Sequence, residues 1–506
     1  MIILGLNVFH ADSSACVVRD GKLIAAVEEE RLRRIKHWAG FPAESIRYCL
    51  KEAGVTLSDV DAIAINQNSG ANFLRKVAYI ATKRPHVSLI IDRIRNRNAR
   101  LGIPELLAQH FSGNSFRGSL INVEHHRAHL SSAFHVSPFE NATVVSVDGF
   151  GDFASAAWGI GRGTTIDIEG RVYFPHSLGI FYQALTQFLG FPHYGDEYKV
   201  MGLAPYGKPA FLTEMRQIAR LRGDGGFELD LNYFRHHKEG VSYTWTEGIP
   251  EVGRIFSPAL AELLGPARSP DEPITPRHQD LACSIQAMYE EAFFNLLDVL
   301  QARHGQTAIS IAGGCGMNSV ANGKIRRRTK YERVYVQSAA GDAGGAIGAA
   351  FSVWHEMGGK RDFVMDHAYW GPSYGQNEID ELLQARAQDL SAACTIETID
   401  DEDDLCMRVA ASMAKGEVVG WFQGRLEWGP RALGNRSIVC DPRRADMKNI
   451  LNAKIKRRES FRPFAPSVKQ EAVTEWFEED DNVPFMMQVY QVREAKRAQI
   501  PRRHPC

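Results

Sequence analysis

Residues 123–129 read VEHHRAH and residues 144–149 read VVSVDG, a combination that predicts a metal site at the end of a strand. In a helix, His125 and His129 share one face because residues four apart lie one above the other. Asp148 ends an apolar, β-branched run, so we expect it where a buried strand opens into a glycine turn. Two imidazoles and a carboxylate are thereby directed toward one point.

Residues 341–345, GDAGG, supply a second carboxylate. If Asp342 joins the two histidines and Asp148, two nitrogens and two oxygens converge, and this donor set suits Fe(II), Zn or Mn. His126 is an alternative ligand through its i,i+3 spacing. A lone His-x-x-x-His pair in a helix is more often a partly exposed or hydrogen-bonded pair than a pair of ligands, but the rest of the chain favours the metal site.

Composition excludes several classes of protein. The 506 residues predict two or three domains, each of about 100–200 residues. A net charge of −1 argues against nucleic acid or an anionic membrane as a partner. The eight cysteines form no C-x-x-C pair, which fits a reducing, cytoplasmic compartment. The first residues read as a strand rather than a signal peptide, and no apolar run approaches the roughly 20 residues of a membrane span.

The chain repeats one supersecondary unit. Strands are expected at 2–8, 15–18 and 23–27, with a hairpin at Asp20-Gly21, a helix at 42–52 and a strand at 59–65. A second copy begins with strands at 144–147 and 154–160 and continues with strands at 307–312 and 334–336 and a small-residue helix at 343–350. This pattern predicts a duplicated α/β architecture, with lobes at about 1–140 and 141–360 and a cleft between them.

Glycine-rich turns follow several of these strands and resemble the phosphate and adenosine loops of actin-like ATPases. Glycine lets backbone N–H groups approach phosphate oxygens, and a helix N-terminus adds its dipole. One such turn alone is weak evidence. The residues expected to bind nucleotide are Gly149, Gly313, Gly314, Asn318 and Gly341.

The densest cationic stretch lies at 424–462, beyond a boundary near residue 360. Helices are expected at 378–389 and 401–415 and a strand at 418–422. Arg431, Lys456 and Arg462 lie among Gly, Pro and Asn, and they favour phosphate recognition over a solvated charged face.

His10 follows the first strand, and Lys36 closes the helix-like run at 28–35. A histidine of near-neutral pKa beside a nucleotide cleft can serve as a general base toward a hydroxyl. A hydrogen-bonded turn histidine fits the same spacing.

Taken together, the motifs resemble the O-carbamoyltransferase family of the NodU, TobZ and CmcH type, from residue 5 to about 493. The combination is highly specific. The matching motifs are EEER (28–31), HHRAH (125–129), VDG (147–149), SLG (177–179), EYKVMGLAPYG (197–207), AGG (312–314), GDAG (341–344), GPRALGNRS (429–437) and FRPFAP (461–466).

The resemblance implies an α/β protein with a duplicated actin-like ATPase (ASKHA) fold in residues 1–360 and an incomplete α+β YrdC-like domain in 361–506. Carbamoyl phosphate and ATP, with Mg²⁺, would form carbamoyl adenylate, and the carbamoyl group would pass to a hydroxyl-bearing small molecule, a secondary metabolite or a sugar. Fe(II) or another divalent transition metal is the implied cofactor; neither nucleic acid nor a membrane is an expected partner.

The resemblance also assigns roles to individual residues. His125, His129, Asp148 and Asp342 match iron ligands, and His10 matches the catalytic histidine, with Lys36 as a further match. The residues that match the carbamoyl phosphate and ATP site are Arg431, Lys456 and Arg462.

One departure from the family concerns the C-terminus. The family's YrdC-like domain continues further, with another Arg motif and an Asn-Thr-Ser-Phe-Asn type loop, whereas this sequence ends at Cys506. We therefore expect weak or absent carbamoyl adenylate synthesis, with metal and nucleotide binding retained. The alternatives are a truncated, non-catalytic nucleotide- and metal-binding protein and a tRNA threonylcarbamoyl transferase-like enzyme.

Overall fold

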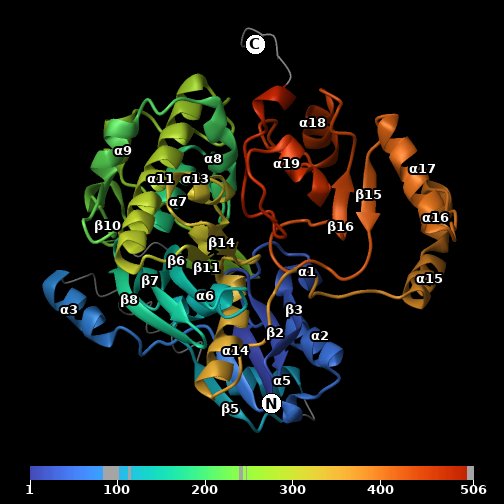
Figure 1. Cartoon of the computed structure of the whole chain (residues 1–506), viewed down its shortest axis with the longest axis horizontal. Helices are drawn as coiled ribbons and strands as arrows, with labels where there is room; N and C mark the ends of the chain where they lie inside the picture. Colours follow the sequence, from blue (N-terminus) through green and yellow to red (C-terminus); the bar gives the residue numbers. More distant parts are fainter. Residues whose placement is uncertain (84–101, 112–114, 239–242, 247, 498–506) are drawn as a thin grey trace.

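The computed structural model describes residues 1–83, 102–111, 115–238, 243–246 and 248–497. Two five-stranded sheets form its N-terminal part, in the orders β3-β2-β1-β4-β5 and β8-β7-β6-β13-β14 (Figure 1). In each sheet three strands run antiparallel, and two further strands extend the sheet in parallel from the first of the three. The shared order confirms the predicted duplicated, actin-like α/β fold.

The strands follow the apolar runs of the sequence. Those of the first sheet are β1 (Ile2–Asn7), β2 (Ser14–Arg19), β3 (Lys22–Glu28), β4 (Ala62–Ile65) and β5 (Ser119–Asn122). Those of the second sheet are β6 (Asn141–Gly151), β7 (Ala154–Arg162), β8 (Thr165–Tyr173), β13 (Ala308–Ala312) and β14 (Arg333–Val336). The predicted hairpin at Asp20-Gly21 is present, with both residues at positive φ.

Two helices lie between the sheets, and each packs on the sheet of the lobe opposite to the one from which it leaves. Helix α6 (His125–Phe134) leaves the first sheet after β5 but packs on β6 and β13 of the second. Helix α14 (Gly345–Glu356) leaves the second sheet after β14 but packs on β1, β2 and β4 of the first. They meet at Gly348, where a Cβ atom would lie 1.7 Å from the carbonyl oxygen of Ala128. The small-residue pattern of α14 is therefore a requirement of close helix packing.

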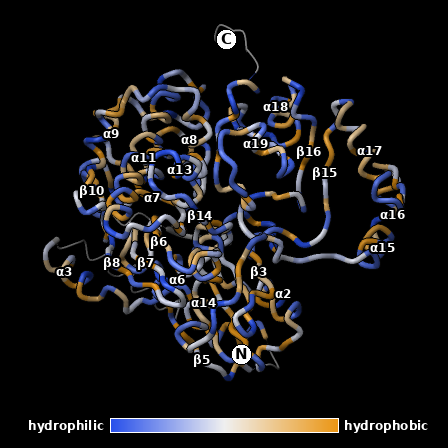
Figure 2. The backbone as a smooth tube through the Cα atoms, viewed as in Figure 1, coloured by the Kyte–Doolittle hydropathy of each residue, from blue (hydrophilic) through white to orange (hydrophobic). Residues whose placement is uncertain are grey.

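Other helices surround the two sheets, and hydrophobic residues alternate with hydrophilic ones along them (Figure 2). The first lobe carries α1 (Glu29–Arg33), α2 (Ala43–Ala53) and α5 (Ile103–His110), whereas α3 (Phe73–Lys83) lies beside β8 of the second lobe (Figure 1). The second carries α7 (Leu178–Phe188), α8 (Glu197–Leu203), α9 (Leu212–Ile218), α10 (Pro258–Leu264), α11 (Pro276–His304), α12 (Ser319–Asn322) and α13 (Ile325–Arg328), with the hairpins β9 (Ala219–Leu221)–β10 (Phe227–Leu229) and β11 (Tyr243–Thr246)–β12 (Ile249–Val252).

Residues after 375 form a smaller C-terminal part beside the second lobe (Figure 1). Its elements are α15 (Gln376–Ala385), α16 (Ala387–Ala393), α17 (Glu402–Ala414), β15 (Val419–Phe422), β16 (Arg436–Val439), α18 (Met447–Ile450) and α19 (Val473–Trp476). Within the described residues its sheet has only β15 and β16, so the YrdC-like assignment stays a prediction. Residues 498–506, the end of the predicted domain, lie outside the described residues.

The single helix predicted at 378–389 is wrong, because the backbone breaks at Arg386 between α15 and α16. The helix predicted at 401–415 is present as α17, and the Asp401 side chain caps it by accepting the N–H of Asp404 at 2.7 Å. None of the helices within the described ranges combines the length with the apolar character that a bilayer-spanning segment requires.

Replacing Gly348 by alanine tests the contact between α6 and α14. The new Cβ would overlap the Ala128 carbonyl, so we expect a loss of about 1–3 kcal/mol in the free energy of unfolding, measured by chemical denaturation. Gly223→Ala is the control, since a Cβ there meets no atom within 4 Å. Equal stability of the two variants would contradict the close packing.

Candidate active site

Four side chains from three separate segments converge between the lobes. His125 and His129 come from α6, Asp148 from β6, and Asp342 from the turn before α14. The two histidine Nε2 atoms lie 3.0 Å apart, and each lies 3.0 Å from Asp148 Oδ2 and 3.6 Å from Asp342 Oδ1. Both rings are buried, so the cluster is enclosed by protein on the side of α6.

Asp148 lies within strand β6, so the prediction that it lies in a turn after the strand is wrong. Strand β6 instead continues to Gly151, and its pairing with β7 is irregular between Val147 and Gly151. Such an irregularity redirects a side chain out of the regular alternation. The Gly314 N–H donates to Asp148 Oδ1 at 3.0 Å, and the Ser177 hydroxyl donates to the Asp148 carbonyl at 2.9 Å.

The donor set fits a divalent transition metal. Adjacent ligand atoms bound at about 2.1 Å to one octahedral ion lie about 3.0 Å apart, close to the spacing found here. Imidazole nitrogen together with carboxylate oxygen suits Fe(II), Zn or Mn. With both rings neutral, as ligation requires, two carboxylate charges stay uncompensated in a buried place, and a divalent cation would balance them.

The electrostatics of the cluster favour a cation. Burial disfavours the ionised form of Asp148, but hydrogen bonding with His125 and His129 outweighs it and holds the pKa of Asp148 well below its ordinary value. Burial also opposes protonation of His129, but the two carboxylates raise its pKa to about 9. His126 faces Ser146 at 2.9 Å instead, and burial lowers its pKa to about 4. The alternative ligand therefore points away from the cluster.

His10 lies at the rim of the cluster. Its Nδ1 is 3.5 Å from Asp342 Oδ2, and its ring stacks on His125 with centroids 5.8 Å apart. Its Nε2 is buried and makes no hydrogen bond to another described residue. Lys36 is exposed, and its Nζ lies 5.2 Å from the centroid of the Tyr198 ring. The structure thus brings His10, but not Lys36, into contact with the four converging side chains.

A second acidic group with one histidine was missed by sequence reasoning. His37 Nδ1 lies 2.8 Å from Asp12 Oδ1, and the His37 N–H donates to Glu30 at 2.7 Å. The ring of Tyr194 lies edge-on to His37 at 5.3 Å, and burial, followed by the charge of Asp342, raises its pKa. Asp12, Glu30 and His37 lie 18 and 7 positions apart with no regular spacing, so no local pattern in the sequence indicates this group.

The predicted glycines lie around the cluster. Gly313 has a φ of 86°, which favours glycine, and a Cβ on Gly314 would lie 2.7 Å from a carboxylate oxygen of Asp148. A Cβ on Gly341 would lie 4.0 Å from the Cα of Gly314, so these two turns face one another. A Cβ on Gly149 would meet no atom within 4 Å. The arrangement leaves backbone, rather than side chains, next to the cluster.

Asn318 has a different environment from the glycines. Its side-chain oxygen accepts the N–H of Ala321 at 3.1 Å and so caps α12. Its amide nitrogen donates to Gln286 at 2.9 Å. Because these internal bonds occupy the amide, a role for Asn318 in binding nucleotide stays a prediction.

Two of the three predicted cations face the second lobe. Arg431 donates to the Met317 carbonyl at 3.4 Å, and the Arg462 guanidinium lies 3.9 Å from the centroid of the Tyr198 ring. Burial, followed by the charge of Arg462, lowers the pKa of Arg431, and no described carboxylate forms an ion pair with Arg431. Lys456 is exposed. Arg431 therefore offers a positive charge without a described carboxylate partner next to Met317, whereas Arg462 forms an ion pair with Glu459 at 3.5 Å.

The segment 424–431 docks on the first lobe as well. The Gly429 N–H donates to Glu28 at 2.8 Å, and Arg31 donates to the Gly429 carbonyl at 2.6 Å. Arg425 donates to the Tyr48 hydroxyl at 2.9 Å. The EEER and GPRALGNRS motifs, about 400 residues apart in sequence, therefore meet in space.

Comparison with known proteins identifies the family of the chain. Residues 2–351 match the family model described as Carbamoyltransferase N-terminus, and residues 410–504 match Carbamoyltransferase C-terminus. An uncharacterized protein of Synechocystis is 40% identical over 98% of this chain and 80% of its own length. The nodulation protein NolNO of Sinorhizobium fredii is 39% identical over 97% of this chain and 68% of its own length. The 3'-hydroxymethylcephem-O-carbamoyltransferase of Amycolatopsis lactamdurans is 32% identical over 42% of this chain and 38% of its own length.

Replacing His129 by alanine tests whether the cluster binds a metal. We expect the affinity for Mn(II), Fe(II) or Zn(II) to fall by at least about 100-fold, because even changes around a ligand cost about 10–100-fold. Titration calorimetry and metal analysis of the purified protein measure this. His126→Asn should keep the metal, and so should His110→Gln, which lies against Phe41. Unchanged affinity in His129→Ala would contradict the assignment.

Proposed function

The chain belongs to the carbamoyltransferase family and is therefore an enzyme, a transferase, and on this premise we propose that it carbamoylates a hydroxyl of a small molecule. The proposed donor is carbamoyl adenylate, made from carbamoyl phosphate and ATP with Mg²⁺. The observation that supports this best is the enclosed cluster of two imidazoles and two carboxylates, one of which accepts the N–H of Gly314 in the glycine turn.

Activation requires that negative phosphates be brought together. We propose that water first cleaves carbamoyl phosphate into carbamate and inorganic phosphate, and that a carbamate oxygen then attacks the α-phosphorus of ATP and releases pyrophosphate. Arg431 and Arg462, with Lys456, would offset the phosphate charge in both steps. Arg431 is half-buried, its Nε makes no hydrogen bond to another described residue, and it has no carboxylate partner among the described residues; these features support that role. We assign this half-reaction to residues 361–506 and the transfer to 1–360, with lobes at about 1–140 and 141–360.

Transfer forms a bond between the acceptor oxygen and the carbamoyl carbon and breaks the bond from that carbon to the phosphate oxygen of AMP. We propose that His10 takes the acceptor proton through its Nε2, while its Nδ1 faces Asp342 at 3.5 Å. Fe(II) or another divalent transition metal, held by His125, His129, Asp148 and Asp342, would supply Lewis-acid polarisation and neutralise phosphate charge.

The glycine turns shape this step. Gly149, Gly314 and Gly341 carry no side chains of their own, so an adenylate phosphate could approach the backbone at these turns. The Amycolatopsis relative is named for carbamoylating a hydroxymethyl group, and a hydroxyl acceptor is proposed here too. A secondary metabolite or a sugar is the acceptor class we propose, in the cytoplasm, where ATP is available.

His10→Asn should slow transfer without removing the metal. Loss of a general base lowers a rate by about 10²–10⁴-fold, so we expect kcat to fall within that range while bound metal stays at the wild-type level. Mass spectrometry of carbamoylated products from a panel of hydroxylated metabolites measures the rate. His110→Asn, a histidine elsewhere on the first lobe, is the control. A wild-type kcat in His10→Asn would remove His10 from the mechanism.

Arg431→Ala should impair activation. Losing one hydrogen-bonded charge to phosphate costs about 1.5–3 kcal/mol, so we expect the KM for carbamoyl phosphate to rise about 10–100-fold. Pyrophosphate release from ATP measures this. The matched control is Arg443→Ala, because Arg443 is exposed and paired with Asp441. Equal KM values in the two variants would exclude the proposed phosphate contact.

A further inference from the structure

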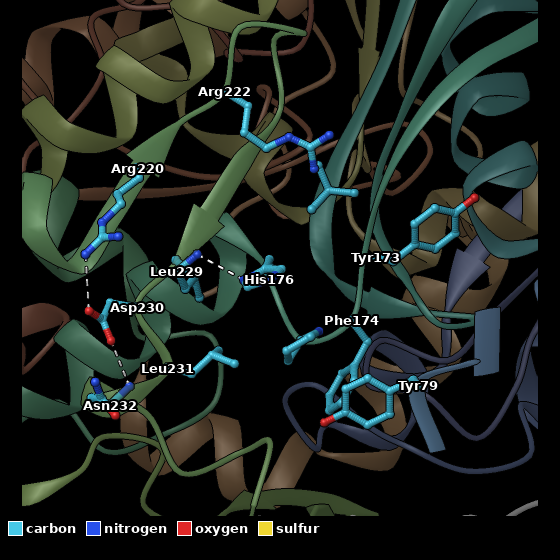
Figure 3. Close-up of a pocket in the computed structure, with 12 residues that line it drawn as sticks. Tyr79, Tyr173, Phe174, His176, Arg220, Arg222, Leu229, Asp230, Leu231 and Asn232 are labelled. Carbon is cyan, nitrogen blue, oxygen red and sulfur yellow. Dashed lines mark hydrogen bonds and ion pairs between the residues drawn. The ribbon is translucent and has the colours of Figure 1, made fainter. Parts of the chain in front are cut away.

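A cavity of about 550 Å³ lies between the edge strand β8, the β9–β10 hairpin and helix α3 (Figure 3). This volume lies in the range of about 300–1,000 Å³ that small-molecule sites occupy. None of the residues assigned above to the metal, the nucleotide or carbamoyl phosphate lines it. The cavity is therefore separate from the site where the carbamoyl group is transferred.

One side of the cavity is aromatic. Tyr79 from α3 and Phe174 after β8 lie edge to face with ring centroids 5.2 Å apart, and Tyr173 lines the same side. Arg75 lies 4.9 Å from the centroid of the Tyr173 ring and supports it from α3. Figure 3 shows Tyr79 and Phe174 together, across from Asp230 and Asn232. Such a surface accepts the flat, apolar face of a ring.

The opposite side is polar but electrically balanced. Arg220 pairs with Asp230 at 3.4 Å, and Arg222 pairs with Asp224 and with Glu228. The exposed amide of Asn232 makes no hydrogen bond to another described residue. An ionic ligand therefore finds no unpaired charge, whereas a wholly apolar ligand would desolvate these groups without replacing their hydrogen bonds.

The aromatic side is connected to the cluster through the β6–β7 turn. The Phe174 N–H donates to the Phe153 carbonyl at 3.1 Å, and the Phe174 ring packs on the Phe153 ring at 5.5 Å. In the same turn, Asp152 accepts the N–H of His125 at 2.9 Å and that of Asn68 at 2.7 Å. The β6–β7 turn therefore contacts Phe174 at the cavity and also binds the backbone of His125, the first residue of α6.

We propose that this cavity binds a neutral, hydroxylated ring, a saccharide unit, belonging to the acceptor that is carbamoylated at the cluster; the inference rests on the proposed function. A saccharide ring presents C–H groups on its faces to Tyr79, whose ring is supported by the buried Phe174. Its hydroxyl groups, at the edge, can bond with the amide of Asn232 and the carboxylate of Asp230. The cavity takes a unit remote from the reacting hydroxyl, so its binding energy orients the acceptor and brings it to the cluster.

Saturation-transfer NMR and titration calorimetry on the full chain test the proposal. The probes are cellotetraose and maltotetraose as neutral saccharides, with glucuronate as an anionic comparison. We expect at least one tetrasaccharide to bind and glucuronate not to bind. Tyr79→Ala and Asn232→Ala should each weaken tetrasaccharide binding by about fivefold or more. Asn232 is exposed, so its variant stays informative if replacing Tyr79 disturbs α3.

Leu74→Ala is the matched control, because Leu74 is an exposed residue of α3 that does not line the cavity. It should bind saccharide as the wild type does. The proposal is overturned if neither tetrasaccharide binds, or if glucuronate binds more tightly than they do. It is also overturned if Tyr79→Ala and Asn232→Ala bind the tetrasaccharides as tightly as the wild type. Metal affinity and pyrophosphate release, measured on the same variants, should stay unchanged. If the wild type neither bound metal nor released pyrophosphate, the proposed function would be contradicted, but a measured saccharide affinity would still support a saccharide site in this cavity.

Discussion

The close contact between α6 and α14 is the constraint on which the rest of the structure depends. Each helix leaves one lobe and packs on the sheet of the other, and Gly348 lets the two backbones approach at Ala128. This exchange brings the beginnings of both helices to one place. His125 is the first residue of α6, and Asp342 lies in the turn just before α14. Wider separation of the helices would pull imidazoles and carboxylate apart.

Negative and positive charges come from different parts of the chain. The carboxylates of Asp148 and Asp342 concentrate negative charge at the cluster, while Arg431 and Arg462 present positive charge from the C-terminal part. The segment 424–431 spans both lobes, because Gly429 is held by the first lobe and Arg431 reaches the second. Any change in the angle between the lobes would therefore move the cationic side chains relative to the glycine turns.

Much of the fold could be predicted because its information is local. Apolar β-branched runs predicted the strands, Asp20-Gly21 predicted a hairpin, and the small residues after Gly341 predicted a tightly packed helix. The i,i+4 spacing of His125 and His129 indicated a shared face. Prediction failed where a local pattern competes with pairing elsewhere: β6 continues beyond Asp148 through an irregularity, and the helix after 375 breaks at Arg386.

By itself the sequence determined the family, the duplicated α/β fold and the residue types of the candidate site, because composition, periodicity and motif spacing are properties of short segments. Only the tertiary structure decided that His37 pairs with Asp12, that the amide of Asn318 is used internally, and that Gly429 docks on Glu28. These contacts join residues up to about 400 positions apart. Their geometry is set by how the helices and sheets pack together, and no local pattern encodes that packing.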